Sequence, residues 1–577
     1  MKKIFMLTAL ALVQCLVLTA QKMPRWVEKA KKAMLTVETY DGKGNVWKGN
    51  GFFVGEDGEA VSDYTLFEGA TGATVTDAGG QRMEVTHVLG ADDMYDVIRF
   101  RVAAPRKTPF LQVADGVPVA GEAVYVLPPV SRGGEAAVRA PVVEVSTIRE
   151  TYRYFEVEAP LPAEWLSVPL LTADGRVFAL AQADASSRSH TFGVSVPYVR
   201  SLHVGSMDLW NTTYASVGIR KAWPGTPQDA QVALMLYASQ QDARAYLETL
   251  NDYIAHFPDS YDGYAKRASH YAFRRGDLAG ADAEGAPGRM LTLAAEDMKT
   301  AHRYAGDRAA AYYDEASMIY GVVTGDSAAL PAGWSLEVAE DCLRKAIEGD
   351  DRPEYHRLEG DMALYRDDYG AAYEAYMTVN RSAAASPNSF YMAAKAREQM
   401  AEHSPAEVIA LLDSAAGRSL PSEALPYLEE CAGLKMEAGM YDAAIRDYDR
   451  CYDLTAGNVS DAFYYLREQA KFRSGDLDGA LRDIGAAVRM QPDNAVYHAE
   501  MASVYLRRQD PPAAQACVEK ALAIDPAFAS SHRLLGLCHL RQDRKDEACN
   551  AFRRAEELGD PVVRKLIREN CEAEGED

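Results

Sequence analysis

Several signatures of enzymes that use nucleotides or metals are missing from the chain. It has no glycine-rich phosphate loop and no dinucleotide-binding fingerprint, and the pair Gly79 and Gly80 has the pattern of a hairpin turn. The eight cysteines include no C-x-x-C pair, and the eleven histidines are scattered along the sequence. We therefore expect no cofactor and no metal site.

Positive charge and long apolar runs are also scarce. The chain has 61 Lys and Arg residues against 84 Asp and Glu residues, which gives a formal net charge of -23. Such a surface repels nucleic acid and anionic membranes, so we expect neither as a partner. It suits a protein that binds neutral or basic polypeptide. Beyond residue 20 no apolar run reaches the roughly 18 residues of a spanning helix, which predicts that the chain has no transmembrane anchor.

The one long apolar stretch lies at the N-terminus. Two lysines precede it, and small residues around Ala20 predict a cleavage site before Gln21. We therefore predict a signal peptide and an exported mature protein that is soluble and periplasmic.

The cysteines beyond the signal peptide all lie in the C-terminal half of the chain. Their spacing within helical patterns favours small buried apolar residues over a disulfide framework or a metal site. An oxidising compartment leaves open the pairing of some of them. The seven residues are Cys342, Cys431, Cys451, Cys517, Cys538, Cys549 and Cys571.

Between residues 49 and 202 a series of short strings follows one order. Residues 49–70, GNGFFVGEDGEAVSDYTLFEGA, contain a glycine-bounded apolar strand, a turn and a second strand. Residues 88–102, VLGADDMYDVIRFRV, read as a further strand, and residues 159–180, APLPAEWLSVPLLTADGRVFAL, follow later. In this order the strings resemble the HtrA-type trypsin-like serine proteases. The resemblance implies an all-β, chymotrypsin-like double barrel.

The same resemblance assigns the three positions of the protease triad to Thr65, Asp96 and Leu166. Active relatives have histidine at the first position, within a string similar to N-Y-H-V-V. Their nucleophile lies in a string close to A-x-x-x-P-G-N-S-G-G-P-L, and Pro169 and Leu170 fix that register here. Only the aspartate of the triad is retained.

Hydrolysis by such a triad requires a nucleophile, a base that takes its proton, and donors aimed at the developing oxyanion. Threonine has no basic nitrogen, and leucine has no nucleophilic atom. Glu164 replaces the glycine whose N–H helps to form the oxyanion hole, and it would bring negative charge to that place. The resemblance therefore implies a pseudoprotease, and we expect no catalytic residue.

One alternative retains catalysis with a displaced nucleophile. Ser167 lies one residue after the nucleophile position, and His87 or His190 would have to serve as its base. His87 belongs to an alternating strand pattern and His190 to a polar hairpin segment. Neither histidine occupies the base position of the protease register.

From about residue 228 the hydrophobic pattern changes to a helical period and repeats itself. Ala480, Ala514 and Ala548 are spaced 34 residues apart, and the alanines seven positions later keep the same spacing. This register resembles tetratricopeptide repeats, whose helix pairs need small residues where the two helices cross. The resemblance implies an all-α solenoid with a concave groove in which peptides bind.

The predicted groove is formed by the first helices of the last three repeats. Within it Arg473, Arg507 and Arg541 recur every 34 residues. Guanidinium groups match carboxylates, so this basic ladder would bind an acidic peptide. The simpler interpretation is that each arginine complements the dipole at the end of its helix, and both stay open here. The predicted groove residues are Tyr465, Gln469, Phe472, Arg473, Ser503, Leu506, Arg507, Arg533, Leu537 and Arg541.

These patterns predict a multidomain protein. We expect a signal peptide at residues 1–20, a degenerate trypsin-like domain at 21–204, a linker at 205–227, a tetratricopeptide superhelix at 228–565 and an acidic tail at 566–577. The predicted function is non-catalytic binding or scaffolding of polypeptides in the cell envelope. The alternatives are a serine endopeptidase with a displaced nucleophile and a structural subunit of an envelope complex.

Overall fold

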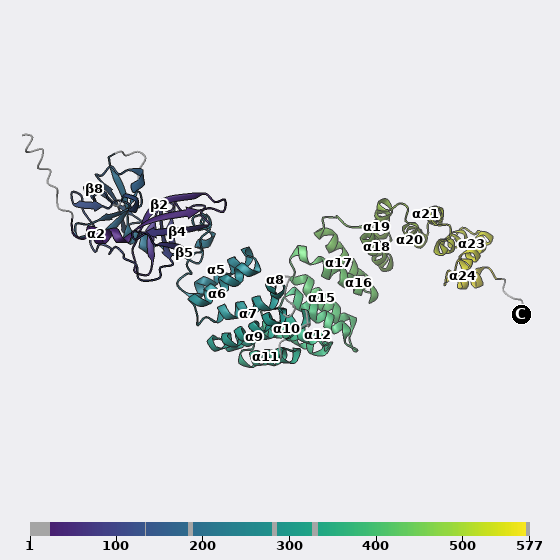
Figure 1. The fold of residues 1–577 in the computed structure, drawn as a ribbon. Coiled ribbons are helices and arrows are strands. Elements are labelled where there is room, and N and C mark those ends of the chain that lie inside the picture. The colour runs from purple at the N-terminus through teal and green to yellow at the C-terminus, as the bar shows by residue number, and fades with distance from the viewer. Residues whose placement is uncertain are drawn as a thin grey trace, which may run out of the picture. The chain divides into compact units, whose positions relative to one another are not determined.

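The fold comes from a computed structural model, which describes residues 24–132, 134–182, 189–279, 286–325, 330 and 333–572 (Figure 1). The predicted signal peptide and the last five residues of the predicted acidic tail lie outside these ranges. The chain divides into two compact units, Met1–Tyr304 and Ala305–Asp577. Each unit is described by itself.

The first unit begins with a closed six-stranded barrel in the order β1-β2-β3-β6-β5-β4. Alternating burial of Leu35, Val37 and Thr39 on β1 shows the period of two that a strand with one buried face requires. The turn predicted at Gly79 and Gly80 joins β4 to β5, and Gly80 has a φ of 82°. The strands are β1 Met34–Tyr40, β2 Val46–Phe53, β3 Glu59–Ser62, β4 Gly72–Asp77, β5 Arg82–Asp92 and β6 Val97–Val102.

A second closed barrel follows in the order β10-β11-β12-β9-β8-β7. Its interior is apolar, and the rings of Phe155 and Phe178 meet there edge to face at 4.8 Å. The predicted all-β double barrel is therefore confirmed. The strands are β7 Ala123–Val126, β8 Val138–Ile148, β9 Tyr152–Val157, β10 Pro169–Leu171, β11 Val177–Gln182 and β12 Thr191–Ser195.

Short helices accompany the barrels. They are α2 Val27–Ala30, α3 Val196–Ser201 and α4 Thr212–Ala215, with the 3₁₀ turns η1 Lys31–Ala33, η2 Val130–Arg132, η3 Ala163–Trp165 and η4 Asp208–Trp210.

The segment predicted as a linker is packed onto the first barrel. Tyr214, Val217 and Ile219 are buried within the barrel core. Val88 of β5 pairs with Lys221 in a parallel bridge, with backbone hydrogen bonds on both sides of it. The domain limits themselves stay a prediction.

Twenty helices, α5 to α24, follow in the described part of the chain. Those of the first unit are α5 Pro227–Gln240, α6 Ala243–His256, α7 Tyr261–Phe273, α8 Arg275–Ala279 and α9 Ala286–Tyr304. Those of the second unit are α10 Arg308–Gly325, α11 Leu336–Gly349, α12 Pro353–Tyr365, α13 Tyr369–Asn380, α14 Pro387–Gln399, α15 Pro405–Arg418, α16 Leu425–Glu437, α17 Tyr441–Leu454, α18 Asp461–Ser474, α19 Leu477–Met490, α20 Ala495–Arg507, α21 Pro511–Ile524, α22 Ala529–Leu540, α23 Lys545–Glu557 and α24 Val563–Asn570, with the 3₁₀ turn η5 Pro421–Glu423 before α16.

The helices pack as pairs, α12 with α13, α18 with α19, α20 with α21 and α22 with α23 among them. Small residues allow the close approach within a pair. A Cβ atom on Gly536 of α22 would lie 2.4 Å from the ring of Phe552 in α23, and one on Gly360 of α12 would lie 2.8 Å from Tyr376 in α13. An all-α repeat array is the predicted fold class for this half, and these pairs confirm it. Its membership of the tetratricopeptide family stays a prediction.

The cysteines divide into two groups. Five are free and buried, as the helical spacing predicts: Cys342, Cys431, Cys451, Cys517 and Cys538. Cys549 of α23 and Cys571 after α24 form a disulfide with a Cα–Cα distance of 5.6 Å. This disulfide links the end of α24 to α23. The sequence left open whether some cysteines are paired, and these two are.

None of the helices in the described residues is both long and apolar enough to cross a bilayer.

Candidate functional site

The structure brings together the loops that carry the positions of the predicted triad. The backbone N–H of Thr65 donates to Oδ1 of Asp96 at 2.7 Å. Asp63, two residues before Thr65, accepts a hydrogen bond from the Ser167 hydroxyl at 2.5 Å. Three loops that lie far apart in the sequence therefore come together. They carry the positions that the resemblance assigns to the base, the aspartate and the nucleophile of the triad.

The loop around the predicted nucleophile position is held by hydrogen bonds that its backbone carbonyl groups accept. Nδ2 of Asn50 on β2 donates to the backbone oxygens of Glu164 and Leu166, both at 2.8 Å. Trp165 between them is buried, and its N–H donates to the carbonyl of Pro162. The side chain at the nucleophile position is that of Leu166, which is half-buried.

Ser167 is directed into the protein. Its side chain is only 1% exposed, and its N–H donates to the carbonyl of Ala181 on β11. Its φ of 61° lies in the left-handed region, which non-glycine residues adopt only at a cost and when their surroundings impose it. The hydroxyl is therefore fixed against Asp63 and is not presented to solvent.

Asp63 has an unusual protonation equilibrium. Burial raises the pKa of its carboxyl group, and the nearby charge of Asp96 raises it as well. The hydrogen bond from Ser167 acts in the opposite direction, but the balance stays above the ordinary value. Neutral donors thus surround a carboxyl group that sequence reasoning did not identify. Its signal in the sequence was an acidic residue directly after the buried strand β3.

The two histidines of the displaced-nucleophile alternative have other partners. Nε2 of His87 on β5 lies 3.7 Å from Oδ2 of Asp252 in α6. Nδ1 of His190 lies 3.4 Å from Oε1 of Glu156 on β9 and 3.0 Å from the Ser189 hydroxyl. The group that the Ser167 hydroxyl contacts is a carboxyl group.

The predicted groove residues lie on three helices, at half-buried or exposed positions. Tyr465, Gln469, Phe472 and Arg473 are on α18; Ser503, Leu506 and Arg507 are on α20; Arg533 and Leu537 are on α22, and Arg541 follows it. The guanidinium group of Arg507 donates to the carbonyl of Phe472 and lies 4.8 Å from that ring. Arg533 pairs with the buried Asp560 at 2.8 Å.

The three arginines of the predicted ladder all lie at helix C-termini. Arg473 and Arg507 are in the last turns of α18 and α20, and Arg541 is the C-cap of α22. All three are exposed. These positions are the ones at which a cation complements the helix dipole. Binding of an acidic peptide by the ladder stays a prediction.

One buried carboxyl group in this region was not anticipated. Glu468 of α18 is fully buried, its Oε2 accepts a hydrogen bond from Gln469, and its Oε1 has no partner among the described residues. Burial raises the pKa of Glu468 to about 8. Its place in the repeat corresponds to Gly536 and Ala502 of the later repeats, and a charged residue in that small-residue register was the available signal.

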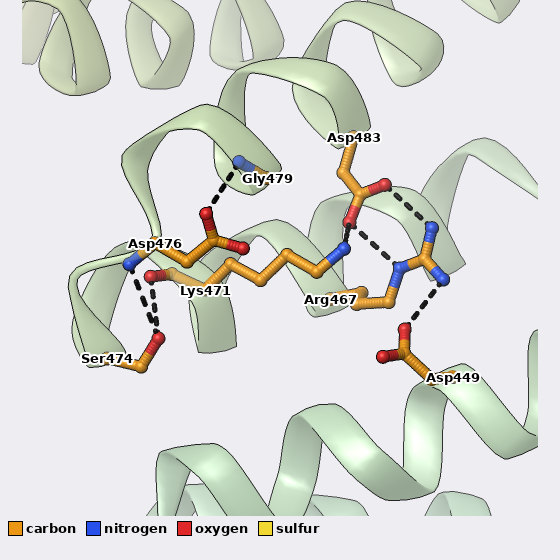
Figure 2. Close-up of polar contacts among 7 residues, drawn as sticks. All are labelled: Asp449, Arg467, Lys471, Ser474, Asp476, Gly479 and Asp483. Atoms are coloured by element: carbon orange, nitrogen blue, oxygen red, sulfur yellow. Dashed lines mark hydrogen bonds and ion pairs between the residues drawn. The ribbon is translucent and has the colours of Figure 1, made fainter.

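A network of charges joins α17, α18 and α19, and its members are buried except for Asp449 of α17, which is exposed (Figure 2). Arg467 donates to both oxygens of Asp483 at 2.7 and 2.8 Å and to Asp449 at 3.0 Å. Lys471 donates to Asp483 at 2.8 Å. Sequence reasoning missed this network, because arginine and lysine within helical patterns usually lie at the surface.

A related arrangement occurs in the preceding repeat. Asp413, Cys431 and Asp447 lie close enough together to hold a metal ion. Nζ of Lys435 lies 2.8 Å from Asp413 and 2.7 Å from Asp447, so an ammonium group already takes the position of a cation. We assign this cluster to the packing of the repeat.

Comparisons with known proteins give partial matches to solved structures. No family model matches the chain, and no curated protein matches it. Among solved structures, the chain is similar to the HtrA-type protease AlgW with tripeptide, and to a variant of AlgW with tripeptide. Each match has 14% sequence identity and a TM-score of 0.26, and covers 30% of this chain. The chain spans 60% of the length of each of these structures. The double-barrel fold stands on its own strand order.

Proposed function

We propose that the chain is an exported pseudopeptidase that binds or scaffolds polypeptides in the cell envelope without cleaving them. Its double barrel has the architecture of a serine protease, with leucine at the nucleophile position. Its helical half would be a tetratricopeptide superhelix, a type of fold whose concave and lateral surfaces bind peptides.

The observation that carries this proposal is the burial of Ser167 and the hydrogen bond of its hydroxyl group. A nucleophile must meet the carbonyl carbon of a substrate and give its proton to a base. Ser167 is 1% exposed, and its hydroxyl is bonded to the half-buried carboxyl group of Asp63. Thr65 at the base position offers Asp96 a backbone N–H in place of an imidazole N–H.

Two further features favour export and polypeptide binding. The disulfide between Cys549 and Cys571 fits an oxidising compartment such as the periplasm. The net charge of -23 favours encounter with neutral or basic chains over acidic ones.

A binding experiment tests the proposal. Unfolded polypeptides labelled with a fluorophore are titrated with the mature full-length chain, and anisotropy reports binding while mass spectrometry reports their integrity. We expect saturable binding and intact polypeptides after long incubation. The free fluorophore serves as the control. Absence of saturable binding would remove the binding half of the proposal, and fragments that vanish with Ser167→Ala would favour the endopeptidase alternative.

A further inference from the structure

A hollow of about 690 Å³ opens between α11, α12 and the first turn of α13. It lies wholly within the second unit and shares no lining residue with the predicted groove. Its size falls within the roughly 300–1,000 Å³ of pockets that bind small ligands or single large side chains.

The floor of the hollow is apolar. Leu343 of α11 and Met362 of α12 form it, and they are 3% and 2% exposed. Ile347 is half-buried beside them, and Ala371 lies exposed at the rim on α13. A leucine or aromatic side chain bound here would move from water onto an apolar surface, which is favourable.

The positive charges at the rim already have acidic partners. Arg366 donates to both oxygens of Glu340 at 2.7 Å. Arg344 is paired with Asp341 one turn away. Neither guanidinium group is therefore left to attract an acidic ligand.

Negative charge at the rim is less compensated. Glu348 at the end of α11 is exposed, and no hydrogen bond or ion pair to it occurs among the described residues. Glu359 of α12 is also exposed, and it accepts a hydrogen bond from His356 at 2.8 Å. The hollow therefore combines an apolar floor with two exposed acidic groups, of which Glu359 has a histidine partner and Glu348 has none among the described residues, in a protein whose overall field is negative.

We propose that this hollow docks an extended polypeptide segment in which a large apolar side chain stands next to a lysine or arginine. The apolar side chain lies on Leu343 and Met362, and the cation faces Glu348 and Glu359. The proposal rests on the proposed function and specifies the class of polypeptide that is bound. An apolar core surrounded by a polar rim is the usual arrangement of protein interfaces.

The test uses the full-length mature chain and three short fluorescein-labelled peptides in a Ser-Gly background. They contain one Leu-Lys, one Leu-Glu or one Ser-Lys pair. The protein variants are Glu348→Lys with Glu359→Lys, which reverses the rim charge, and Ala371→Trp, which fills the hollow. The matched control is Glu354→Lys with Glu374→Lys, which makes the same charge change on α12 and α13 outside the hollow.

We expect the Leu-Lys peptide to bind the unaltered chain at least about tenfold more tightly than either other peptide, a difference of about 1.4 kcal/mol. The rim-reversed and filled variants should each lose about tenfold in affinity, and the control should stay within about twofold. Circular dichroism melting checks that all the variants are folded.

Equal binding of the Leu-Lys peptide to the unaltered, rim-reversed and filled chains would overturn the proposal. The proposal would also be overturned if the chain binds unfolded polypeptides but binds the Leu-Lys, Leu-Glu and Ser-Lys peptides with equal affinity. Both of these results leave polypeptide binding itself intact. Failure of every polypeptide to bind refutes the proposed function instead, so the two failures are distinguishable.

Discussion

The barrels and the helical half bury acidic groups among different neighbours. In the first barrel Asp63 is surrounded by neutral donors, with the Ser167 hydroxyl closest to it. In the helical half Asp483 lies between two cations, Arg467 and Lys471 (Figure 2). Two cations face the charge of Asp483, whereas at Asp63 burial raises the pKa by more than the neutral donors lower it.

The difference shows how each region uses its polar residues. At the barrel site they bond to one another inside the protein, and leucine fills the position that the resemblance predicts for the nucleophile. In the helical half the inward charges hold helices together, and the rim of the hollow at α11–α13 is acidic and exposed. If the proposals hold, the two regions separate a closed protease-like site from an open binding surface.

The largest effect is expected from the buried network. Asp483→Ala leaves Arg467 and Lys471 buried without their shared partner, and the free energy of unfolding should fall by about 3–5 kcal/mol. Urea unfolding measures it. The control is Asp478→Ala in the same helix, whose exposed pair with Arg508 should matter little. A loss no larger than that of the control would show that the network does not stabilise the repeats.

A pH-dependent effect should follow from Glu468. Its pKa of about 8 in the folded chain lies above its ordinary value of 4.5, so the folded state binds a proton that the unfolded state releases. Stability of the second unit should therefore fall as pH rises from about 5 to about 8, by at most about 1.4 kcal/mol per pH unit. Glu468→Gln should remove this slope, because glutamine keeps the shape and does not titrate.

Unfolding at several pH values measures that slope. Glu402→Gln, at an exposed position, is the control and should keep the pH dependence of the unaltered chain. Identical slopes for the unaltered chain and Glu468→Gln would contradict the raised pKa.

A smaller effect is expected in the barrel. Ser167→Ala removes one neutral hydrogen bond to the half-buried Asp63, which should cost about 1–3 kcal/mol of stability. Ser146→Ala, at an exposed position on β8, should be close to neutral. If Ser167→Ala leaves the melting temperature unchanged, the Ser167 hydroxyl is not tied to Asp63 as described.

The smallest effect is expected from the ladder of exposed arginines. Replacing Arg473, Arg507 and Arg541 by alanine should cost about 0.3–1 kcal/mol of stability for each helix end, and leave affinity for polypeptides unchanged. Anisotropy with an acidic peptide measures the affinity. A loss of about tenfold or more would instead make the ladder a carboxylate-binding surface.

The fold could be predicted from sequence to a large extent, because it depends on repeated local signals. Alternation such as that of Leu35, Val37 and Thr39 indicates a strand, and alanines at a 34-residue spacing indicate helix pairs. The adjacency of Thr65 and Asp96 also followed from the order of the strings. Such patterns can be recognised in a single sequence because many residues contribute to each of them.

The details of the site could not be predicted in the same way. The contact between Asp63 and Ser167 depends on a positive φ at Ser167, which three converging loops impose. The pair Cys549 and Cys571 depends on how α24 folds back onto α23. The burial of Glu468 depends on the size of its neighbours across the helix pair. In each case tertiary packing decides the outcome.

The most direct test of the central claim is fluorophosphonate labelling of the purified mature chain. The probe reacts with serine hydroxyl groups that a base activates, and an HtrA-type protease labelled in parallel provides the positive control. We predict no labelling of this chain above the level seen with Ser167→Ala. Labelling that disappears with Ser167→Ala would contradict the account, because it would show an accessible and activated nucleophile in the barrel.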